Sequence, residues 1–355
     1  MEGIINIICG RRTDDIVAGA CLSALLESLR PSGSNTEVTN DFLMSDERNK
    51  ISEMLLQGSF AKRTDLVVGL PLDAPVFDKV MRKEPLDYFG YKIPRLWDNH
   101  ICSLRYRDGG YRNVSATSGE SLTSQVLIWF KQLFEQLSPS PEAVSLLESM
   151  SGIPPLIEKN MNLAGCDPRE ASRLNVLSYV YSPAYIYSKI RKNGGPAPAL
   201  HDLMDSPAAD NYIKQQKKRI ESLMKSVRST EHGAKAAILA GRKFSECDLD
   251  NLTLAWLITR KNCRLFAVVR EASPIGGLIR MSFRGTKGNS GESAYKLQEE
   301  IRTGQIKGAS AAVVIEETRT RSELFFRAGP TFKFADLIKK FSQLFGEIQT
   351  NQKEG

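Results

Sequence analysis

Three short apolar runs within the first hundred residues each lead directly into a polar loop: residues 4–8, 65–70 and 92–97. After the first run come the turn 10–15 and then, over residues 16–29, apolar residues at helical spacing. A strand, a polar loop and a helix in that order are typical of the opening unit of a parallel α/β sheet. Open sheets of this kind bind ligands at the carboxyl ends of their strands. We therefore expect the three loops to meet at one functional edge.

The rest of the first half is expected to be mostly helical. Shorter helices are predicted over residues 47–56 and from residue 76, and a strongly amphipathic helix over residues 121–137, with hydroxyls near Ser118 and Ser121 available to cap it. Further helices are expected through Leu147, through Leu163 and over the tyrosine-rich segment 178–190. The cluster Gly194-Gly195-Pro196-Ala197-Pro198 is expected to interrupt regular structure.

A long polar helix rich in lysine and arginine is predicted over residues 208–230, and a second α/β unit from about Ala234. That unit is expected to contain strands at residues 236–240, 265–269, 278–283, 311–315 and 324–327, with helices near 247–259, 292–302 and 334–346. The predicted division is an α/β domain at 1–205, a basic linking helix at 206–231 and a smaller α/β domain at 232–355.

Composition sets the frame for this prediction. The 355 residues are enough for two domains with separate cores. The six cysteines are scattered and form no Cys-x-x-Cys pair, so neither disulfides nor a zinc knuckle are expected. A reducing, cytoplasmic compartment is predicted. The first residues lack the basic region of a signal peptide, and no apolar run of about 18 residues predicts a membrane span. The formal charge of +7 is compatible with a polyanionic partner and equally with simple solubility.

The third run ends in Asp98-Asn99-His100. This tripeptide resembles the Asp-His-His signature of the DHH phosphoesterase superfamily, which includes the RecJ-type exonucleases, with asparagine in place of the middle histidine. Other segments resemble further motifs of that family and occur along the chain in the family's order. They are residues 7–20, the strand leading to Asp73, the Ser/Thr-rich segment 115–120, and Ser282-Phe283-Arg284 in the second half. The resemblance implies a parallel-sheet DHH domain with flanking helices, a linking helix and a smaller DHHA1-like C-terminal domain.

The resemblance also implies a site for two divalent ions, usually manganese, which activate a water and neutralise phosphoryl charge. Several positions matching the family's metal ligands are changed here. The first-motif histidine falls on Cys9, its aspartates on Thr13 or Asp14 and on Asp15, and the second-motif aspartate near Leu70 and Pro71, with Asp73 a distant substitute. Segment 151–155, expected to hold the last aspartate, has no carboxylate, and segment 306–312 lacks the family's Gly-Gly-Gly-His element.

The resemblance therefore implies a degenerate site with no assigned catalytic residue. The degenerate positions are Cys9, Asp14, Asp15, Asp98, Asn99 and His100. Asp15 and Asp98 are the remaining candidates for metal ligands. No cofactor is expected, and manganese or magnesium is expected if the protein is active.

Each of these residues also has a purely structural interpretation. Asp14 and Asp15 supply favourable charge at a helix N-terminus. Asp98 is placed to cap and anchor the next loop, and His100 to form a hydrogen bond in a partly buried position. Cys9, at the end of an apolar strand, has the position of an inert core residue.

Basic residues are the candidates for binding phosphate. The resemblance places two of them, Arg11 and Arg12, on the loop at the family's metal site, where their guanidinium groups are expected to replace the lost metal charge and to bind phosphate in a bidentate manner. Arg284 and Arg280 lie on one face of the predicted Ser-x-Arg strand. The predicted set is Arg11, Arg12, Arg280, Arg284, Lys287, Lys217 and Lys218. The helix 208–230 remains open to two interpretations, a solvated connector or a wall that contacts phosphates.

Our leading hypothesis is a degenerate RecJ-like protein that binds single-stranded nucleic acid or serves as a non-catalytic subunit of a DNA replication, DNA repair or RNA-processing assembly. Family precedent is a RecJ-like subunit of the replicative helicase in eukaryotes and archaea. The alternative is an active metal-dependent phosphoesterase on short oligonucleotides or nucleotides, using Asp14, Asp15, Asp73, Asp98 and His100 with a single ion. A third hypothesis is a nucleotide sensor without turnover. Expected partners are nucleic acid and replication or repair proteins, with no membrane.

Overall fold

The computed structural model describes residues 4–43, 63–70, 72, 85–99, 101–117, 121–161, 168–192, 196–223, 228–229, 236–240, 265–271, 277–285, 290–318 and 321–351. The chain divides into two compact units, Met1–Ile213 and Lys214–Gly355. The expected α/β class, with a parallel sheet followed by a smaller C-terminal domain, is confirmed. The finer division at residues 205 and 231 stays a prediction.

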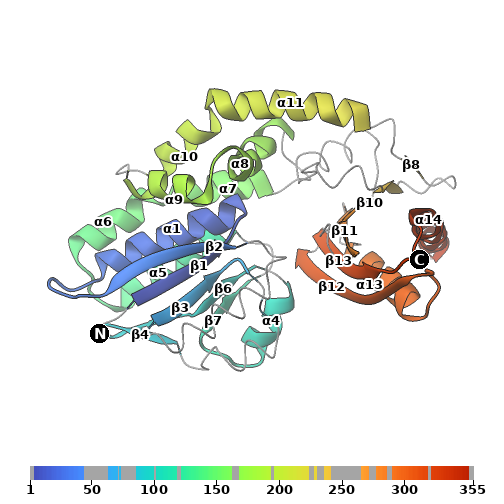
Figure 1. Ribbon diagram of the computed structural model, residues 1–355. Helices are drawn as coiled ribbons and strands as arrows, with labels where there is room; N and C mark the ends of the chain where they lie inside the picture. The colour runs from blue at the N-terminus through green and yellow to red at the C-terminus, as the bar shows by residue number, and fades with distance from the viewer. Residues whose placement is uncertain are drawn as a thin grey trace. The chain divides into compact units, whose positions relative to one another are not determined.

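The first unit is built on a five-stranded parallel sheet in the order β2-β1-β3-β6-β7 (Figure 1). Parallel pairing requires a crossover connection between successive strands. The strands are β1 (Ile4–Gly10), β2 (Glu37–Leu43), β3 (Arg63–Val68), β6 (Leu96–Asp98) and β7 (Val114–Ala116).

Nine helices are described in this unit or begin in it. They are α1 (Thr13–Ser28), α4 (Ile101–Asp108), α5 (Leu122–Gln136), α6 (Pro141–Ser149), α7 (Ile153–Met161), α8 (Pro168–Val180), α9 (Pro183–Lys192), α10 (Pro196–Met204) and α11 (Pro207–Leu223). The expected helix 121–137 is confirmed, with Ser121 as its N-cap accepting a hydrogen bond from the Ser124 amide. The expected segment 178–190 is divided between α8 and α9, because Pro183 begins a new helix.

One expected strand, 92–97, is replaced by two shorter ones. β5 (Tyr91–Ile93) pairs antiparallel with β4 (Leu86–Tyr88) in a separate hairpin, and only β6 joins the main sheet. Pro94 lies at the break, where its missing N–H cannot contribute to a ladder. Apolar character alone could not reveal this change of partner, because residues of both strands are buried.

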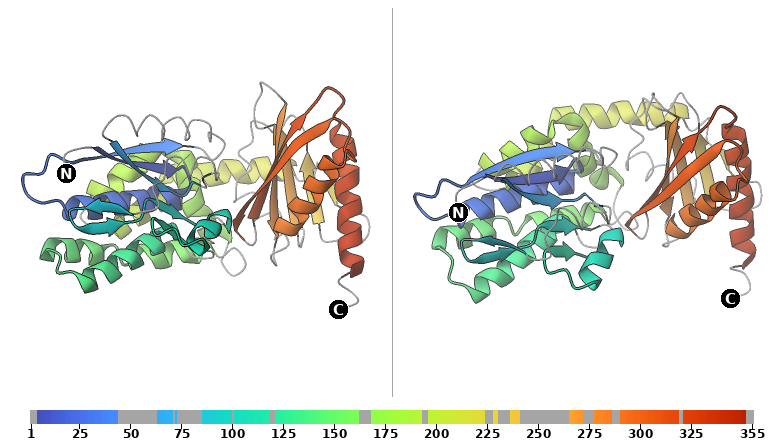
Figure 2. Two further views of the ribbon diagram at one scale, coloured as in Figure 1. Left: turned by 90° about the horizontal axis from the view of Figure 1, so that it is seen from below. Right: turned by 60° about the horizontal axis from the view of Figure 1, so that its bottom comes forward.

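The two faces of the sheet are covered differently. On one face, Ile5, Ile7 and Cys9 of β1 pack with the apolar residues of α1 and α5. The ribbon of α1 lies against this face of the sheet (Figure 2). On the other face, Ile8 of β1 packs in a smaller cluster that includes Tyr106 of α4. This alternation follows from the period of two along a strand.

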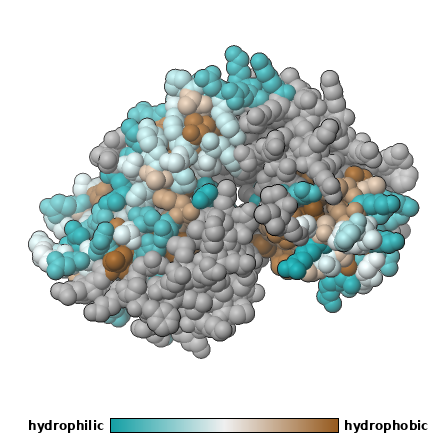
Figure 3. All heavy atoms as spheres, viewed as in Figure 1, coloured by the Kyte–Doolittle hydropathy of each residue, from teal (hydrophilic) through white to brown (hydrophobic). Residues whose placement is uncertain are grey.

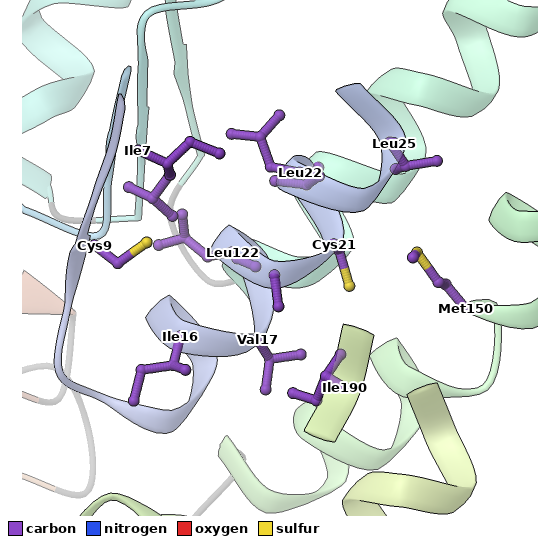
Figure 4. Close-up of a cluster of buried hydrophobic side chains, with 14 of the residues drawn as sticks. Ile7, Cys9, Ile16, Val17, Cys21, Leu22, Leu25, Leu122, Met150 and Ile190 are labelled. Carbon is purple, nitrogen blue, oxygen red and sulfur yellow. The ribbon is translucent and has the colours of Figure 1, made fainter. Parts of the chain in front are cut away.

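The approach of α1 to β1 depends on one glycine. A Cβ added at Gly19 would lie 2.2 Å from the sulfur of Cys9, well inside van der Waals contact. Figure 4 shows Cys9 in the apolar cluster between β1 and α1, together with Ile7, Ile16 and Leu122. Close packing of helix on strand therefore requires the smallest side chain at residue 19.

The second unit contains a six-stranded sheet in the order β12-β13-β11-β10-β9-β8. Its pairs are antiparallel, except that β9 and β10 run parallel. The strands are β8 (Arg228–Ser229), β9 (Ala236–Ala240), β10 (Leu265–Glu271), β11 (Leu278–Gly285), β12 (Ala309–Thr318) and β13 (Arg321–Ala328). Helices α13 (Ser290–Arg302) and α14 (Phe334–Asn351) supply residues such as Leu297 and Phe341 to the core on one sheet face.

The expected basic helix 208–230 is shorter in the structure. The helix α11 ends at Leu223, and β8 already includes residues 228 and 229. The part of α11 that is coloured in Figure 3 is predominantly hydrophilic on the face shown. The expected helices at 47–56, 76–81 and 247–259 lie outside the described residues. Within the described part of the chain, no helix has the length and apolar character needed to cross a bilayer.

We predict that Gly19→Ala lowers the free energy of unfolding by about 1–2 kcal/mol, because overpacking outweighs the better helix propensity of alanine. The measurement is urea unfolding followed by circular dichroism. The same substitution in a Cys9→Ala background should be neutral or stabilising, because the opposing sulfur is gone. An equal loss in both backgrounds would contradict the proposed contact.

Candidate functional site

The strands that lead into the three predicted loops end at one edge of the parallel sheet. The strands β1, β3 and β6 are neighbours, and their register places Cys9 beside Val68 and Val68 beside Trp97. The chain therefore leaves the three strands at Gly10, Gly69 and Asp98, side by side. The Gly69 amide donates to the Trp97 carbonyl at 2.8 Å and continues this alignment past the end of β3.

Arg12 connects two of these loops through its guanidinium group. Its Nη2 donates to Oδ1 of Asp15 at 2.8 Å and to Oδ1 of Asn99 at 3.1 Å. Its Nε lies 3.0 Å from Oδ2 of Asp15, so the carboxylate is bound in a bidentate manner. The Arg12 backbone amide also donates to Oδ2 at 3.3 Å. Asp15 is thus one of two acidic residues in the first turn of α1 and the principal partner of the Arg12 guanidinium.

The carboxylate of Asp15 fits into a space that two glycines leave open. A Cβ at Gly10 would lie 2.2 Å from Oδ2 of Asp15, and a Cβ at Gly69 would lie 2.2 Å from Oδ1. Gly69 also has φ of +72°, which favours glycine on its own. Asp15 is only 1% exposed. Burial of this carboxylate therefore depends on two small residues and on the charge of Arg12.

Asp14 points away from Asp15 and binds helix α5. Its Oδ2 accepts from the Leu122 amide at 2.7 Å, and its Oδ1 accepts from the Thr123 amide at 3.1 Å and the Thr123 hydroxyl at 2.8 Å. These amides belong to the first turn of α5, where no intrahelical acceptor is available. Burial raises the pKa of Asp14 above its ordinary value, and the three hydrogen bonds offset part of that rise.

Asp98 is the last residue of β6 and Asn99 follows it, and both are buried. The Ser103 hydroxyl of α4 donates to Oδ2 of Asp98. The side-chain oxygen of Asn99 accepts from Arg12, as described above. Asn99 therefore acts as a neutral acceptor for a guanidinium. His100 lies outside the described residues.

Cys9 has no access to the edge of the sheet. Its side chain is buried on the face that packs on α1, and desolvation, followed by the negative charges of Asp15 and Asp41, raises the pKa of its thiol well above the ordinary range. A neutral thiol is a poor nucleophile and a poor metal ligand.

The described carboxylates do not fit a centre for two metal ions. Asp15 is bound by Arg12, Asp14 by the first turn of α5, and Asp98 by Ser103. Among the described residues, no three His, Cys, Asp or Glu side chains converge as a metal site would require. Asp73, the suggested substitute, lies outside the part that the structure describes.

Arg11 is the exposed cation of the same loop. Its Nε donates to the carbonyl of Phe42 at the end of β2, at 3.3 Å. Among the described residues, no hydrogen bond involves its Nη1 or Nη2. Arg11 and Arg12 therefore differ: one guanidinium is committed to a buried carboxylate, and the other reaches solvent.

In the second unit, Arg280 forms an ion pair that was not predicted. Its Nε lies 3.0 Å and its Nη2 3.2 Å from the carboxylate oxygens of Glu323. Ser282 donates to the same carboxylate at 2.6 Å. Glu323 is 1% exposed and sits on β13 directly opposite Ser282. The sequence signal for it was a single acid before the apolar residues 324–326.

The remaining predicted phosphate ligands are placed only in part. Arg284 is 4% exposed on β11, Lys218 is exposed on α11, the side chain of Lys217 is not described, and Lys287 lies outside the described residues. Sequence analysis also missed Gly10, Gly69, Thr123 and Ser103. The two glycines beside strand ends were the available signal, because such positions often mark a close approach.

Comparisons with known proteins give only distant matches. No family model matches the chain. Over 148 residues, 37% of the chain, it is 26% identical to phosphoribosylaminoimidazole-succinocarboxamide synthase of Streptococcus uberis, and the match spans 60% of that enzyme.

Among solved structures, the chain is similar to exonuclease RecJ bound to manganese (12% identity, TM-score 0.49), with 97% of this chain and 90% of that chain covered. It is similar to RecJ in complex with Mn²⁺ from Thermus thermophilus (12% identity, TM-score 0.47, 97% and 52% covered). It is also similar to CDC45 from Entamoeba histolytica (9% identity, TM-score 0.42, 97% and 95% covered). These values describe a similarity and assign no activity.

We predict that Arg12→Met lowers the free energy of unfolding by about 1–3 kcal/mol, because it leaves the carboxylate of Asp15 buried without its cation. This figure is below that for a fully buried pair, since the Arg12 side chain is 30% exposed. The free energies of unfolding of the natural protein, Arg12→Met, Asp15→Asn and the double variant, measured by chemical unfolding, form a double-mutant cycle. Additive losses would show that the pair is not coupled and would contradict the assigned role.

A second prediction concerns pH and Asp14. In the unfolded chain its carboxyl group titrates near 3.8, and in the folded chain at a higher pH because the pKa is raised. Between those values the folded state binds more protons, so the contribution of Asp14 to the free energy of unfolding falls as the pH rises. The stability difference between the natural protein and Asp14→Asn should therefore decrease from pH 3.8 upward and level off above the raised pKa. An increase over that range, measured by urea unfolding, would contradict the direction of the shift.

Proposed function

We propose that this protein is a degenerate member of the DHH superfamily that binds single-stranded nucleic acid at the carboxyl edge of its parallel sheet without hydrolysing it. In this role it serves as a non-catalytic component of a DNA replication, DNA repair or RNA-processing assembly. The observation that carries the proposal is the guanidinium of Arg12 bound between Asp15 and Asn99.

A guanidinium in this position opposes metal binding in two ways. It neutralises the buried carboxylate of Asp15, so the negative charge that would attract a divalent ion is already compensated. A metal ion would also have to displace several hydrogen bonds of Arg12, including the one that Asn99 accepts. A histidine bound to a metal at residue 99 could not accept that hydrogen bond from arginine. Asp14 and Asp98 are bound to other groups. The described residues therefore offer no set of ligands for a metal ion that would activate a water.

The same edge retains features that suit a phosphate chain. Arg11 places an exposed guanidinium on the loop after β1, and arginine binds phosphate through parallel hydrogen bonds. The pair Arg12–Asp15 holds the backbone of that loop, because the Arg12 amide also donates to Asp15. The net charge of +7 favours encounter with a polyanion. The proposal is therefore binding through phosphates, which does not depend on base sequence.

The test of inactivity uses a short end-labelled single strand incubated with Mn²⁺. We expect no release of mononucleotide above the level seen with metal omitted. Manganese-dependent release by the natural protein that disappears in Asp15→Ala would overturn the proposal and establish an active phosphoesterase. Including Asp15→Ala separates activity of this site from a contaminating nuclease.

We predict that Arg11→Ala weakens binding to single strands by about 3- to 10-fold and lowers the slope of log K against log salt by about 0.7–1, because one phosphate contact is lost. Fluorescence anisotropy of a labelled strand at several salt concentrations provides the measurement. Lys131→Ala is the matched control, since Lys131 is exposed on α5, well beyond the first turn that Asp14 caps. Equal effects of both variants would indicate nonspecific charge. Tight association with a protein and no affinity for single strands would indicate a pure scaffold.

A further inference from the structure

The outer face of α9 and the residues just before it carry a ladder of two tyrosines and a lysine. The rings of Tyr181 and Tyr185 are stacked, with centroids 5.2 Å apart and an interplanar angle of 21°. The Nζ of Lys189 lies 5.6 Å from the centroid of the Tyr185 ring. Helical residues at a spacing of four, such as Tyr185 and Lys189, lie above one another. The ladder therefore runs along one line of the helix surface from its N-terminal end.

The opposite face of α9 explains why the ladder faces outward. Ile186, Tyr187 and Ile190 are buried in the core cluster that also contains residues of α1. Tyr185 is 43% exposed, a large value for an aromatic side chain in the described part of the protein. Tyr181 also packs partly against this core cluster. Folding of the unit thus accounts for the inner residues and for Tyr181, and leaves the exposed Tyr185 ring unexplained.

The helix α9 has a net positive charge. The helix α9 contains Lys189, Arg191 and Lys192 and no acidic residue. Arg191 is partly neutralised by Glu27 of α1. Exposed aromatic rings among basic residues are the combination that binds unpaired bases together with their phosphates. A negatively charged peptide would use the lysines but would have no need of stacked rings.

We propose that the Tyr181–Tyr185–Lys189 ladder is a second contact for single-stranded nucleic acid, in which a base stacks on the Tyr185 ring. The base takes the place of the Lys189 ammonium over the ring, and Lys189 moves to the adjacent phosphate. This inference rests on the proposed function, since it assigns a further contact to the same kind of partner, and it involves a different surface from the loop of Arg11.

The exchange is favourable in magnitude. A cation over an exposed tyrosine ring favours that contact by about 2- to 5-fold in its equilibrium constant. Stacking of one base on an aromatic side chain raises the binding constant of the strand by about 5- to 100-fold. Lys189 also gains a phosphate in place of the ring. The pair Tyr179–Tyr212 offers a contrast, because those stacked rings join two helices, α8 and α11, and so already have a structural role.

The experiment compares two probes of equal length, an oligothymidylate and an abasic strand with the same phosphates, by fluorescence anisotropy at fixed salt. The natural protein should bind the thymidylate strand about 5- to 100-fold more tightly. Tyr185→Ala should lose most of that preference while keeping the affinity for the abasic strand, and Tyr185→Phe should retain it. Tyr295→Ala is the matched control, because Tyr295 of α13 is 48% exposed and lies in the other unit.

The outcomes separate this inference from the proposed function. Equal affinity of the natural protein for both probes, or an unchanged preference in Tyr185→Ala, would overturn the ladder as a base contact and leave phosphate binding through Arg11 intact. No affinity for either probe would overturn both. Loss of the preference in Tyr295→Ala as well as in Tyr185→Ala would also overturn it, because the effect would then not be specific to α9. Circular dichroism of each variant confirms that α9 remains folded.

Discussion

The ion pair between Arg12 and Asp15 is the interaction on which the candidate site depends. Asp15 is buried between the backbones of Gly10 and Gly69, where an uncompensated carboxylate would be costly. The guanidinium supplies the opposite charge and extends it to Asn99 on the neighbouring loop. One cation thereby fixes the ends of β1, β3 and β6 relative to each other. The described acidic residues at this edge are therefore bound by protein groups and are not arranged as metal ligands.

The adjacent Asp14 shows how two consecutive carboxylates serve different ends. Successive helical residues point about 100° apart, so Asp15 faces the sheet edge while Asp14 reaches the first turn of α5. Asp14 joins two helices by accepting from free backbone amides. The acidic first turn of α1 therefore stabilises the fold through both residues. Of the charged residues between Gly10 and Asp15, all of which are described, only Arg11 is exposed.

Sequence patterns predicted the regular elements well wherever period and caps agreed. The helices near 121–137, 292–302 and 334–346 and the strands β9 to β13 of the second sheet were located by apolar periodicity. The strand β8 was not predicted, because its residues were expected in the basic helix. The strand expected at 92–97 was wrong because Pro94 divides it between two sheets. The basic helix was expected to be longer than α11, because polarity and charge carry no signal for where a helix ends. The ion pair of Arg280 with Glu323 depends on strand register, which periodicity does not specify.

The sequence by itself determined the fold class, the order of the elements and the set of polar residues at the strand ends. It also showed that several positions of a metal-binding pattern were changed. Only the tertiary structure decided what the remaining carboxylates do, because their partners come from segments far apart in the chain: Asn99 for Arg12, Leu122 and Thr123 for Asp14. Local patterns report period and propensity, whereas the role of a buried charge is set by whichever groups the fold places within hydrogen-bonding distance.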